Sequence, residues 1–311
     1  MIFNNILYRV VQKLKYHFST DTTLKRIAEI NRHNKRIIEN KKSYKVIEID
    51  LEIPKEKFDY IFEEKAFELL LSNFHALKSK YRILNNMLIC EFDTFKFHIL
   101  SKSELYIINE IFVEQCYKFC LPEGEAICVI DLGMNVGIAS LYFANIRNVE
   151  KVYSFEPFTP TFNSAIFNLN LNQKLSKKIN PFDFGLGIKD DVLYVEYNKL
   201  NTGINSSLKK NYHSDNPNVQ KIIIKNASDI VTSIINKNRG MRFIIKVDTE
   251  GSEYDILKSI SKNLLHKSIV GIMLEWHFKG SLKLEEQLVN CGFHLISTNI
   301  NKNSGLIYGF K

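Results

Sequence analysis

Two acidic residues in this sequence stand where a short apolar segment ends and a turn follows. Asp131 closes the segment AICVID and is followed by Gly133 and Gly137. Glu156 closes the segment KVYSFE, 19 residues after Gly137. Ligands of open parallel sheets bind beyond the carboxyl ends of the strands, so both carboxylates are predicted at one binding edge. An acid about 20 residues beyond such a turn is the usual partner of ribose hydroxyls, so the pair predicts a nucleoside site.

The turn between the two acids narrows the choice of nucleoside. Its glycines allow close approach of the backbone to a ligand, and the following helix presents unpaired N–H groups. A dinucleotide site would show G-x-G-x-x-G, but only two glycines fit here, and Asp131 would repel a pyrophosphate. A nicotinamide dehydrogenase is therefore disfavoured. A carboxylate suits S-adenosylmethionine, which carries an ammonium group, a sulfonium and a ribose diol, and this is the predicted cofactor.

Further acidic residues follow the fourth and fifth apolar segments, in IIKVDTEGSEYDIL and IMLEWH. The predicted catalytic residues are His277, Asp248 and Glu250. His277 is the first candidate for a general base, because its ordinary pKa of about 6.5 lies closest to neutral pH. Glu253 is explained by a helix N-terminus, where negative charge is favourable. These residue types also suit hard or borderline metal ions, but no dedicated metal motif is present, so no metal site is predicted.

The segments that carry these residues alternate with helical stretches after residue 125. The five apolar segments are AICVID, KVYSFE, KINPFDFGLG, FIIKVD and IVGIMLEW. Such alternation predicts an α/β fold with a mostly parallel sheet and helices on both faces. FHLISTNI and GLIYGFK predict a closing hairpin that adds an antiparallel strand. An insertion at 191–230 contains two more β-type segments, DVLYVEY and KIIIKN.

The part of the chain before these segments is lysine-rich and has helical periodicity. We predict a helical N-terminal extension over residues 1–85 and a catalytic domain over 86–311. From residue 86 onward, NMLICEF and TFKFHIL predict a hairpin, and SELYIINEIFVEQCYKF predicts a helix.

Taken together, these motifs resemble the FkbM family of S-adenosylmethionine-dependent methyltransferases. The resemblance rests on VIDLGMNVGIASLYFA, VYSFEPFTPTFNSAIFNLNLN, IIKVDTEGSEYDILKSI and IVGIMLEWH, and covers roughly residues 95 to 280. It implies a class I methyltransferase (Rossmann-like) fold and, usually, O-methylation of a hydroxyl group. Met134 departs from the small residue that the family usually has there.

The resemblance also implies roles for individual residues. By motif position, the methionine end of the cofactor is assigned to a turn made of Asp131, Gly133, Asn135 and Gly137. Glu156 is assigned to the ribose. Asp183 or Phe184 is expected near the adenine, and Asp248 is expected to border both the cofactor and the acceptor.

Composition sets limits on location and partners. The chain has 311 residues, a net charge of +8 and five cysteines in no paired spacing, which predicts reduced thiols in a cytoplasmic protein. No run reaches the ~18 apolar residues of a spanning helix. The basic, amphipathic start MIFNNILYRVVQKLKYHF fits peripheral contact with the inner membrane surface, or packing on this protein or on a second copy.

The family resemblance leaves the acceptor open. Many members are associated with sugars, polysaccharides or secondary metabolites, so we expect a hydroxyl of a sugar or of a polysaccharide or glycolipid precursor. Candidate contacts for the acceptor are Tyr142, Tyr212, His213 and Trp276. A nucleic-acid methyltransferase is a weaker alternative, because the acidic VDTEG loop would repel phosphate. A non-catalytic or membrane-associated binding protein that retains the fold is another.

Overall fold

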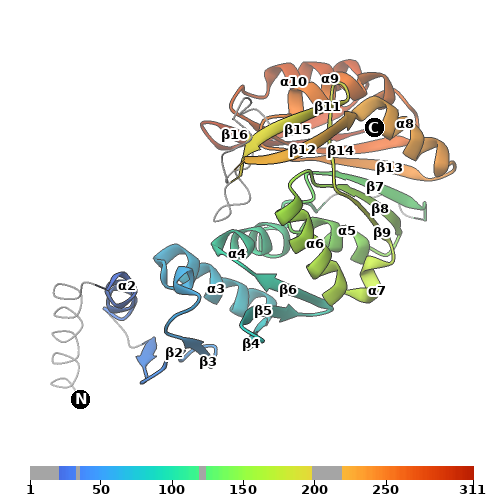
Figure 1. Ribbon diagram of the computed structural model, residues 1–311. Helices are drawn as coiled ribbons and strands as arrows, with labels where there is room; N and C mark the ends of the chain where they lie inside the picture. The colour runs from blue at the N-terminus through green and yellow to red at the C-terminus, as the bar shows by residue number, and fades with distance from the viewer. Residues whose placement is uncertain (1–20, 33–35, 119–123, 198–218) are drawn as a thin grey trace. The chain divides into compact units, whose positions relative to one another are not determined.

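The computed structural model of this protein describes residues 21–32, 36–118, 124–197 and 219–311. The chain divides into two compact units, Met1–Cys116 and Tyr117–Lys311 (Figure 1). The predicted domain boundary after residue 85 therefore falls inside the first unit. The amphipathic start of the chain, Tyr212 and His213 lie outside the described residues.

The first unit contains helices and two small antiparallel sheets. One sheet has the order β1-β2-β3 and the other β4-β5-β6. Its elements, in chain order, are α2 (Thr22–Ile30), β1 (Ile37–Glu39), β2 (Ser43–Val46), β3 (Leu51–Pro54), the 3-10 helix η1 (Asp59–Phe62), α3 (Glu64–Leu77), β4 (Lys80–Leu84), β5 (Met87–Phe92), β6 (Phe95–Ile99), α4 (Lys102–Ile108) and the π-helical turn η2 (Asn109–Val113).

The prediction of an entirely helical extension is corrected by β1, β2 and β3. In β2 and β3 the buried residues alternate with exposed or half-buried ones: Tyr44 and Val46 on one strand, Leu51 and Ile53 on the next. This is the period of two that a half-buried strand requires. Strands of three or four residues contain too few alternations to stand out from the helical pattern of their neighbours.

Two further expectations concern the end of this unit. The predicted hairpin over 86–100 is confirmed, since β5 and β6 pair antiparallel around a turn in which Asp93 has φ 49°. The helix predicted for SELYIINEIFVEQCYKF ends earlier, at Val113. Gln115 has φ 57°, in the left-handed region that a helix cannot continue through.

The second unit is built on a seven-stranded sheet. Its elements are β7 (Ile127–Leu132), α5 (Ile138–Asn145), β8 (Val149–Phe155), α6 (Thr159–Leu171), α7 (Gln173–Ser176), β9 (Ile179–Phe182), β10 (Gly185–Gly187), β11 (Asp191–Glu196), β12 (Val219–Asn226), α8 (Ala227–Lys237), β13 (Arg242–Val247), α9 (Glu253–Leu264), β14 (Ile269–His277), α10 (Leu282–Asn290), β15 (His294–Asn301) and β16 (Ser304–Phe310).

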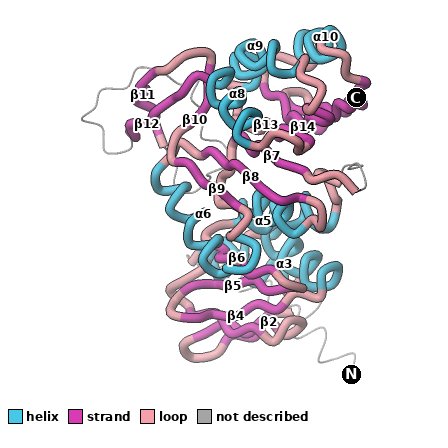
Figure 2. The backbone as a smooth tube through the Cα atoms, turned by 90° about the vertical axis from the view of Figure 1, so that its right-hand side faces the viewer, coloured by secondary structure: helices cyan, strands magenta, loops and turns pink. Residues whose placement is uncertain are grey.

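The strand order of this sheet is β15-β16-β14-β13-β7-β8-β9. Strands β14, β13, β7, β8 and β9 pair in parallel, while β16 is antiparallel to both β14 and β15, as predicted for the closing hairpin. Helices α8, α9 and α10 cover one face of the sheet and α5, α6 and α7 the other (Figures 1 and 2). The predicted α/β class I methyltransferase fold, with helices on both faces, is confirmed.

The core explains why these strands are nearly continuous apolar segments. All six residues of β7 are buried, because a central parallel strand is covered on both faces. One apolar cluster joins β7, β13 and β14 to helices α8, α9 and α10. A separate small sheet, β10-β12-β11, carries the predicted insertion. No described helix has the length and apolar character needed to cross a membrane.

Candidate active site

The turn between β7 and α5 has the backbone geometry that its glycines predict. Gly133 has φ 88° and Gly137 has φ 84°. A Cβ atom at Gly133 would come within 1.8 Å of the Asp248 carbonyl oxygen, so no larger residue fits there. The amides of Gly133 and Met134 both donate to the Phe155 carbonyl, at 3.1 and 2.9 Å. The turn is thereby tied to the end of β8.

Glu156 completes this attachment. Its Oε2 accepts a hydrogen bond from the Asn135 amide at 3.0 Å, and its Oε1 accepts one from the Phe158 amide at 3.0 Å. Each carboxylate oxygen has a second lone pair, so both oxygens remain able to accept from ribose hydroxyls. The Asn135 side-chain oxygen is buried and has no hydrogen-bond partner among the described residues, which leaves an acceptor for a cationic or hydroxylated ligand.

Asp131 has protein partners on both of its side-chain oxygens. Its side chain is fully buried, and both of its oxygens face protein groups rather than the ligand edge. Oδ2 accepts from the Ser140 hydroxyl at 2.5 Å, and Oδ1 lies 3.1 Å from the Lys246 ammonium. The structure therefore makes Asp131 a buried support of the turn, and its direct contact with the cofactor stays a prediction.

Lys246 is the residue that links this turn to β13. Its ammonium donates to the Gly133 carbonyl at 2.6 Å and lies 3.6 Å from Asp248 Oδ2. Burial alone would lower the pKa of Lys246, but the charges of Asp131 and Asp248 outweigh burial and raise it. A buried ammonium held by carboxylates stays charged, so it fixes the turn electrostatically as well as sterically.

The residues expected near the adenine lie at the same edge. The Glu156 amide donates to the carbonyl of Phe182, the last residue of β9, at 3.0 Å. Asp183 is exposed directly after it. The Phe184 ring packs against Phe155 with ring centroids 5.5 Å apart.

We call Asp131, Gly133, Asn135, Gly137 and Glu156 the donor edge.

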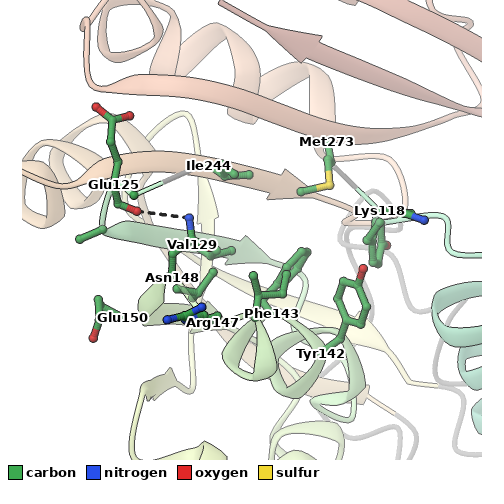
Figure 3. A pocket seen from close by; sticks show the side chains of 15 residues that line it. Lys118, Glu125, Val129, Tyr142, Phe143, Arg147, Asn148, Glu150, Ile244 and Met273 are labelled. Carbon is green, nitrogen blue, oxygen red and sulfur yellow. Dashed lines mark hydrogen bonds between the residues drawn. The ribbon is translucent and has the colours of Figure 1, made fainter. Parts of the chain in front are cut away.

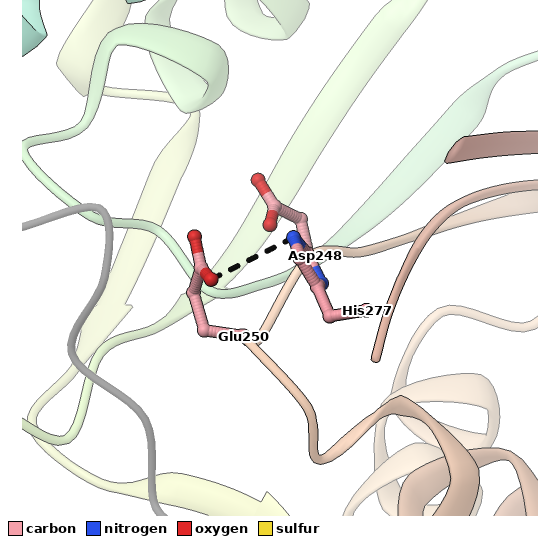
Figure 4. Close-up of side chains that lie close together, drawn as sticks. All are labelled: Asp248, Glu250 and His277. Carbon is pink, nitrogen blue, oxygen red and sulfur yellow. Dashed lines mark ion pairs between the residues drawn. The ribbon is translucent and has the colours of Figure 1, made fainter. Parts of the chain in front are cut away.

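The second predicted constellation is also brought together. Asp248 follows β13 and His277 ends β14; with Glu250 they offer ligand atoms that all lie within 4.8 Å of one another (Figure 4). His277 Nε2 lies 3.6 Å from Glu250 Oε2 and 3.4 Å from Glu275 Oε1. We call Asp248, Glu250, Glu275 and His277 the acid cluster.

Glu253 positions the acid cluster from behind. It is fully buried at the start of α9, and its Oε1 accepts from the amides of Thr249 and Gly251 at 3.1 and 2.8 Å. The same oxygen lies 3.0 Å from His277 Nδ1. The predicted helix-terminus role of Glu253 is present, and Glu253 also orients the imidazole so that Nε2 faces the carboxylates.

The pKa values of the cluster follow from this crowding. Burial and the neighbouring Asp248 raise the pKa of Glu250 to about 8. Burial alone would lower the pKa of His277, but the surrounding carboxylates raise it to about 11. The imidazole is therefore a cation at neutral pH when the protein is alone. The pKa of His277 in this environment therefore no longer favours it as the general base.

A cavity of 940 Å³ lies elsewhere in the second unit (Figure 3). It is lined by apolar residues of β7, β13 and β14, including Val129, Ile244 and Met273, and by Tyr142 and Arg147. No member of the donor edge or of the acid cluster lines it. Trp276 is buried in the core, so of the suggested acceptor contacts that are described, only Tyr142 lines this cavity.

Sequence reasoning missed Lys246 and Ser140. A signal for Lys246 was present: it is the charged residue inside the otherwise apolar segment FIIKV, on a strand buried on both faces. A lysine at such a position is rarely buried without a partner, so it indicates a nearby carboxylate. Nothing in the spacing of Ser140 marks it as the partner of Asp131.

Comparison with known proteins agrees with this geometry. The sequence matches the family described as "Methyltransferase FkbM domain" over residues 131–295, more than half of the chain. A protein named Methyltransferase 1 from Beauveria bassiana is 26% identical over 174 residues, which cover 50% of this chain and 66% of that protein. Methyltransferase sdnD from Sordaria araneosa is 26% identical over 205 residues, which cover 58% of this chain and 78% of that protein. The chain thus spans just under two thirds of the first relative.

The chain also aligns with a solved structure of methyltransferase FkbM from Methylobacillus flagellatus. The alignment covers 80% of this chain and 60% of that chain, with a TM-score of 0.46 and 13% sequence identity. The family match begins at Asp131 and extends through both the donor edge and the acid cluster. The chain therefore belongs to the FkbM methyltransferase family, and its cofactor is S-adenosylmethionine.

Proposed function

We propose that this protein transfers the methyl group of S-adenosylmethionine to a hydroxyl oxygen of a sugar or of a polysaccharide or glycolipid precursor. The observation that carries the proposal is the direct contact between the two edges. The Asp248 amide donates to the Leu132 carbonyl at 3.0 Å, and Lys246 binds the turn at Gly133. A methyl donor on one edge and an acceptor on the other would be adjacent.

The cofactor is assigned to the donor edge. The Glu156 carboxylate is the acceptor for the ribose hydroxyls, and the Asn135 side-chain oxygen faces the methionine end. Charged acceptors make the stronger hydrogen bonds, so Glu156 supplies most of the polar affinity. Asp131 acts through Lys246 and the turn, as its burial requires.

The reaction is an in-line displacement. The hydroxyl oxygen forms a bond to the methyl carbon, the carbon–sulfur bond breaks, and its electron pair stays on sulfur to give S-adenosylhomocysteine. The hydroxyl proton passes to a carboxylate of the acid cluster. Positioning of the two reactants supplies up to ~7–11 kcal/mol of barrier reduction, and a placed base adds ~10²–10⁴-fold.

The acidic edge and the family's chemistry favour a neutral polyol over an anionic acceptor. Carboxylates accept hydrogen bonds from hydroxyls and repel phosphate, so the acid cluster suits a carbohydrate face and not a nucleic-acid backbone.

The proposal is tested in two steps. Calorimetric titration with S-adenosylmethionine and S-adenosylhomocysteine should show one site per chain; absence of heat would leave a non-catalytic protein. Methyl-labelled cofactor is then incubated with glycans, aromatic alcohols, amines, RNA and DNA. Label in glycan supports the proposal, and label confined to amines or nucleic acids overturns it.

A further inference from the structure

We infer that Asp248, Glu250 and His277 form a binding site for one divalent first-row metal ion, of which Mn²⁺ is the matching probe. Each residue offers one ligand atom, and the three atoms lie within 4.8 Å of one another. Two carboxylates, an imidazole and positions open to water form a donor set suited to an ion of intermediate hardness.

One pair of ligand atoms in the cluster is close to the spacing around a bound ion. Neighbouring ligand atoms at about 2.1 Å from an octahedral ion are about 3.0 Å apart. His277 Nε2 is 3.6 Å from Glu250 Oε2, so this pair needs only a small movement. The side chains of Asp248 and Glu250 are 28% and 25% exposed, which leaves room for small rotations and for further oxygen ligands.

The imidazole is held as a metal-binding histidine is held. A ligating histidine usually donates its other ring N–H to a carboxylate, which fixes its tautomer and orientation. Here Nδ1 lies 3.0 Å from Oε1 of Glu253, which is fully buried, and Nε2 faces the carboxylates (Figure 4). His277 itself is only 7% exposed. The second oxygen of Glu253 has no hydrogen-bond partner in the described parts of the chain.

Carboxylates outnumber cations around the acid cluster. Asp131, Asp248, Glu250, Glu253 and Glu275 bring five carboxylates to the adjoining ends of β7, β13 and β14. Within the described residues, their ion pairs are with Lys246 and His277 only. Buried and half-buried carboxylates in excess over cations are costly unless they are protonated or a positive charge joins them, and a divalent ion supplies two positive charges.

The ion would have a direct chemical use at this place. A bound divalent cation lowers the pKa of an oxygen ligand and stabilises an alkoxide. An acceptor with two neighbouring hydroxyls would chelate it and present one oxygen to the methyl group. This use, and hence a vicinal diol as the acceptor class, rests on the proposed function, whereas the ion site itself does not.

The binding test uses the full chain after removal of metals with a chelator. Mn²⁺ is titrated in, and the free ion is followed by electron paramagnetic resonance. We expect saturable binding of one ion per chain, with a hyperfine coupling to an imidazole nitrogen. Linear, unsaturated loss of signal, or saturation without nitrogen coupling, would overturn the site.

Variants assign the ion to these residues. Asp248→Asn and Glu250→Gln should each weaken Mn²⁺ binding by at least ~10-fold, and Glu253→Gln, which loosens the imidazole, by ~10–100-fold. Asp255→Asn is the matched control, because Asp255 is an exposed acid in the first turn of α9. Equal loss in the control, or no loss in Asp248→Asn, would contradict the assignment. If a variant does not fold, the nitrogen coupling of the wild type decides.

The cofactor's own ammonium is the competing occupant. Adding S-adenosylmethionine to the Mn²⁺-loaded protein should leave the ion bound. Stoichiometric displacement of Mn²⁺ would assign the acid cluster to the cofactor's positive charge and overturn the inference. A chain that binds Mn²⁺ but gives no heat with S-adenosylmethionine would retain the ion site and reject the proposed function.

Discussion

The donor edge and the acid cluster are neighbours in one sheet, yet they treat negative charge in opposite ways. At the donor edge each carboxylate is matched by protein groups: Asp131 by Lys246 and Ser140, and Glu156 by two backbone amides. In the acid cluster, Glu250 and Glu275 crowd around the single imidazole of His277. The first region has a protein partner for each carboxylate, and the second has more carboxylates than cations to pair with them.

This difference suggests that the donor edge is preorganised for its ligand, whereas the acid cluster gains stability when it binds one. A donor edge whose charges are already paired has a fixed shape, so it can hold a cofactor without reorganising. An acid cluster with excess carboxylate lowers its free energy when a cation or a polyol enters. Removing the charge of Lys246 should therefore destabilise the first region, and removing a carboxylate charge from the acid cluster should relieve the second.

The largest expected effect is at Lys246. Lys246→Met leaves Asp131 buried without its cation, and breaking one partner of a buried ion pair costs about 3–5 kcal/mol. Urea denaturation of the full chain measures the change in unfolding free energy. Lys221→Met is the matched control, because Lys221 is exposed in the same unit, and it should change stability by less than about 0.5 kcal/mol.

A double variant sharpens this test. Adding Asp131→Asn to Lys246→Met removes the orphaned charge, so part of the lost stability should return. Equal stability of the single variant and the wild type would show that the Asp131–Lys246 pair does not support the turn.

The next effect is the pH dependence that Glu156 gives to stability. Burial raises the pKa of Glu156 from its ordinary 4.5 to about 7, against the opposing effect of its two amide hydrogen bonds. Between these values the unfolded chain loses the proton and the folded chain keeps it, so stability falls as pH rises. At ~1.4 kcal/mol per pKa unit, Glu156 should contribute a loss of about 3 kcal/mol between pH 4.5 and 7.

Glu156→Gln removes this titration, so the difference in unfolding free energy between variant and wild type should change across that window and flatten above it. Glu196→Gln, at an exposed strand position, is the control. A constant difference between Glu156→Gln and the wild type at every pH would place the Glu156 pKa near its ordinary value.

The third effect is on cofactor affinity. Glu156→Ala removes the ribose acceptor and the anchor of the Asn135 amide. Hydrogen bonds to charged groups contribute about 1.5–3 kcal/mol, which predicts affinity for S-adenosylmethionine lowered by ~10–100-fold. Calorimetry at a pH above 7 measures the loss, with Glu196→Gln again as control. Wild-type affinity in Glu156→Ala would remove Glu156 from the ribose contact.

The same contrast explains what could be predicted from sequence. The strands of the second unit, and the positions of Glu156, Asp248 and His277 at their ends, follow from apolar segments long enough to be distinctive. In parallel strands the carboxyl ends share an edge, so the acids had to meet. The structure brings these residues together at the strand ends, and their roles in binding and catalysis stay predictions.

What failed depends on contacts between residues distant in sequence. The partner of Asp131 is Lys246, 115 residues later, and the register of β7 on β13 brings them side by side. Burial lowers the pKa of His277, and hydrogen bonds to Glu253 and Glu275 together with nearby carboxylate charges raise it by more, so the ordinary value for a histidine does not predict it. The strands β1 to β3 were missed because each has only three or four residues.

The smallest expected effect has the opposite sign and lies in the acid cluster. Burial and the charge of Asp248 raise the pKa of Glu275, so its carboxylate destabilises the folded protein when ionised. Glu275→Gln removes one negative charge while its amide can still reach His277. With a side chain 24% exposed, the expected gain in unfolding free energy at pH 8 is up to about 1 kcal/mol. The substitution should change the binding free energy of S-adenosylmethionine at the donor edge by about 0.6 kcal/mol or less, so affinity should stay within about threefold of the wild type. A loss of stability in Glu275→Gln would mean that the carboxylate is matched by the protein after all, and the contrast between the two edges would fail.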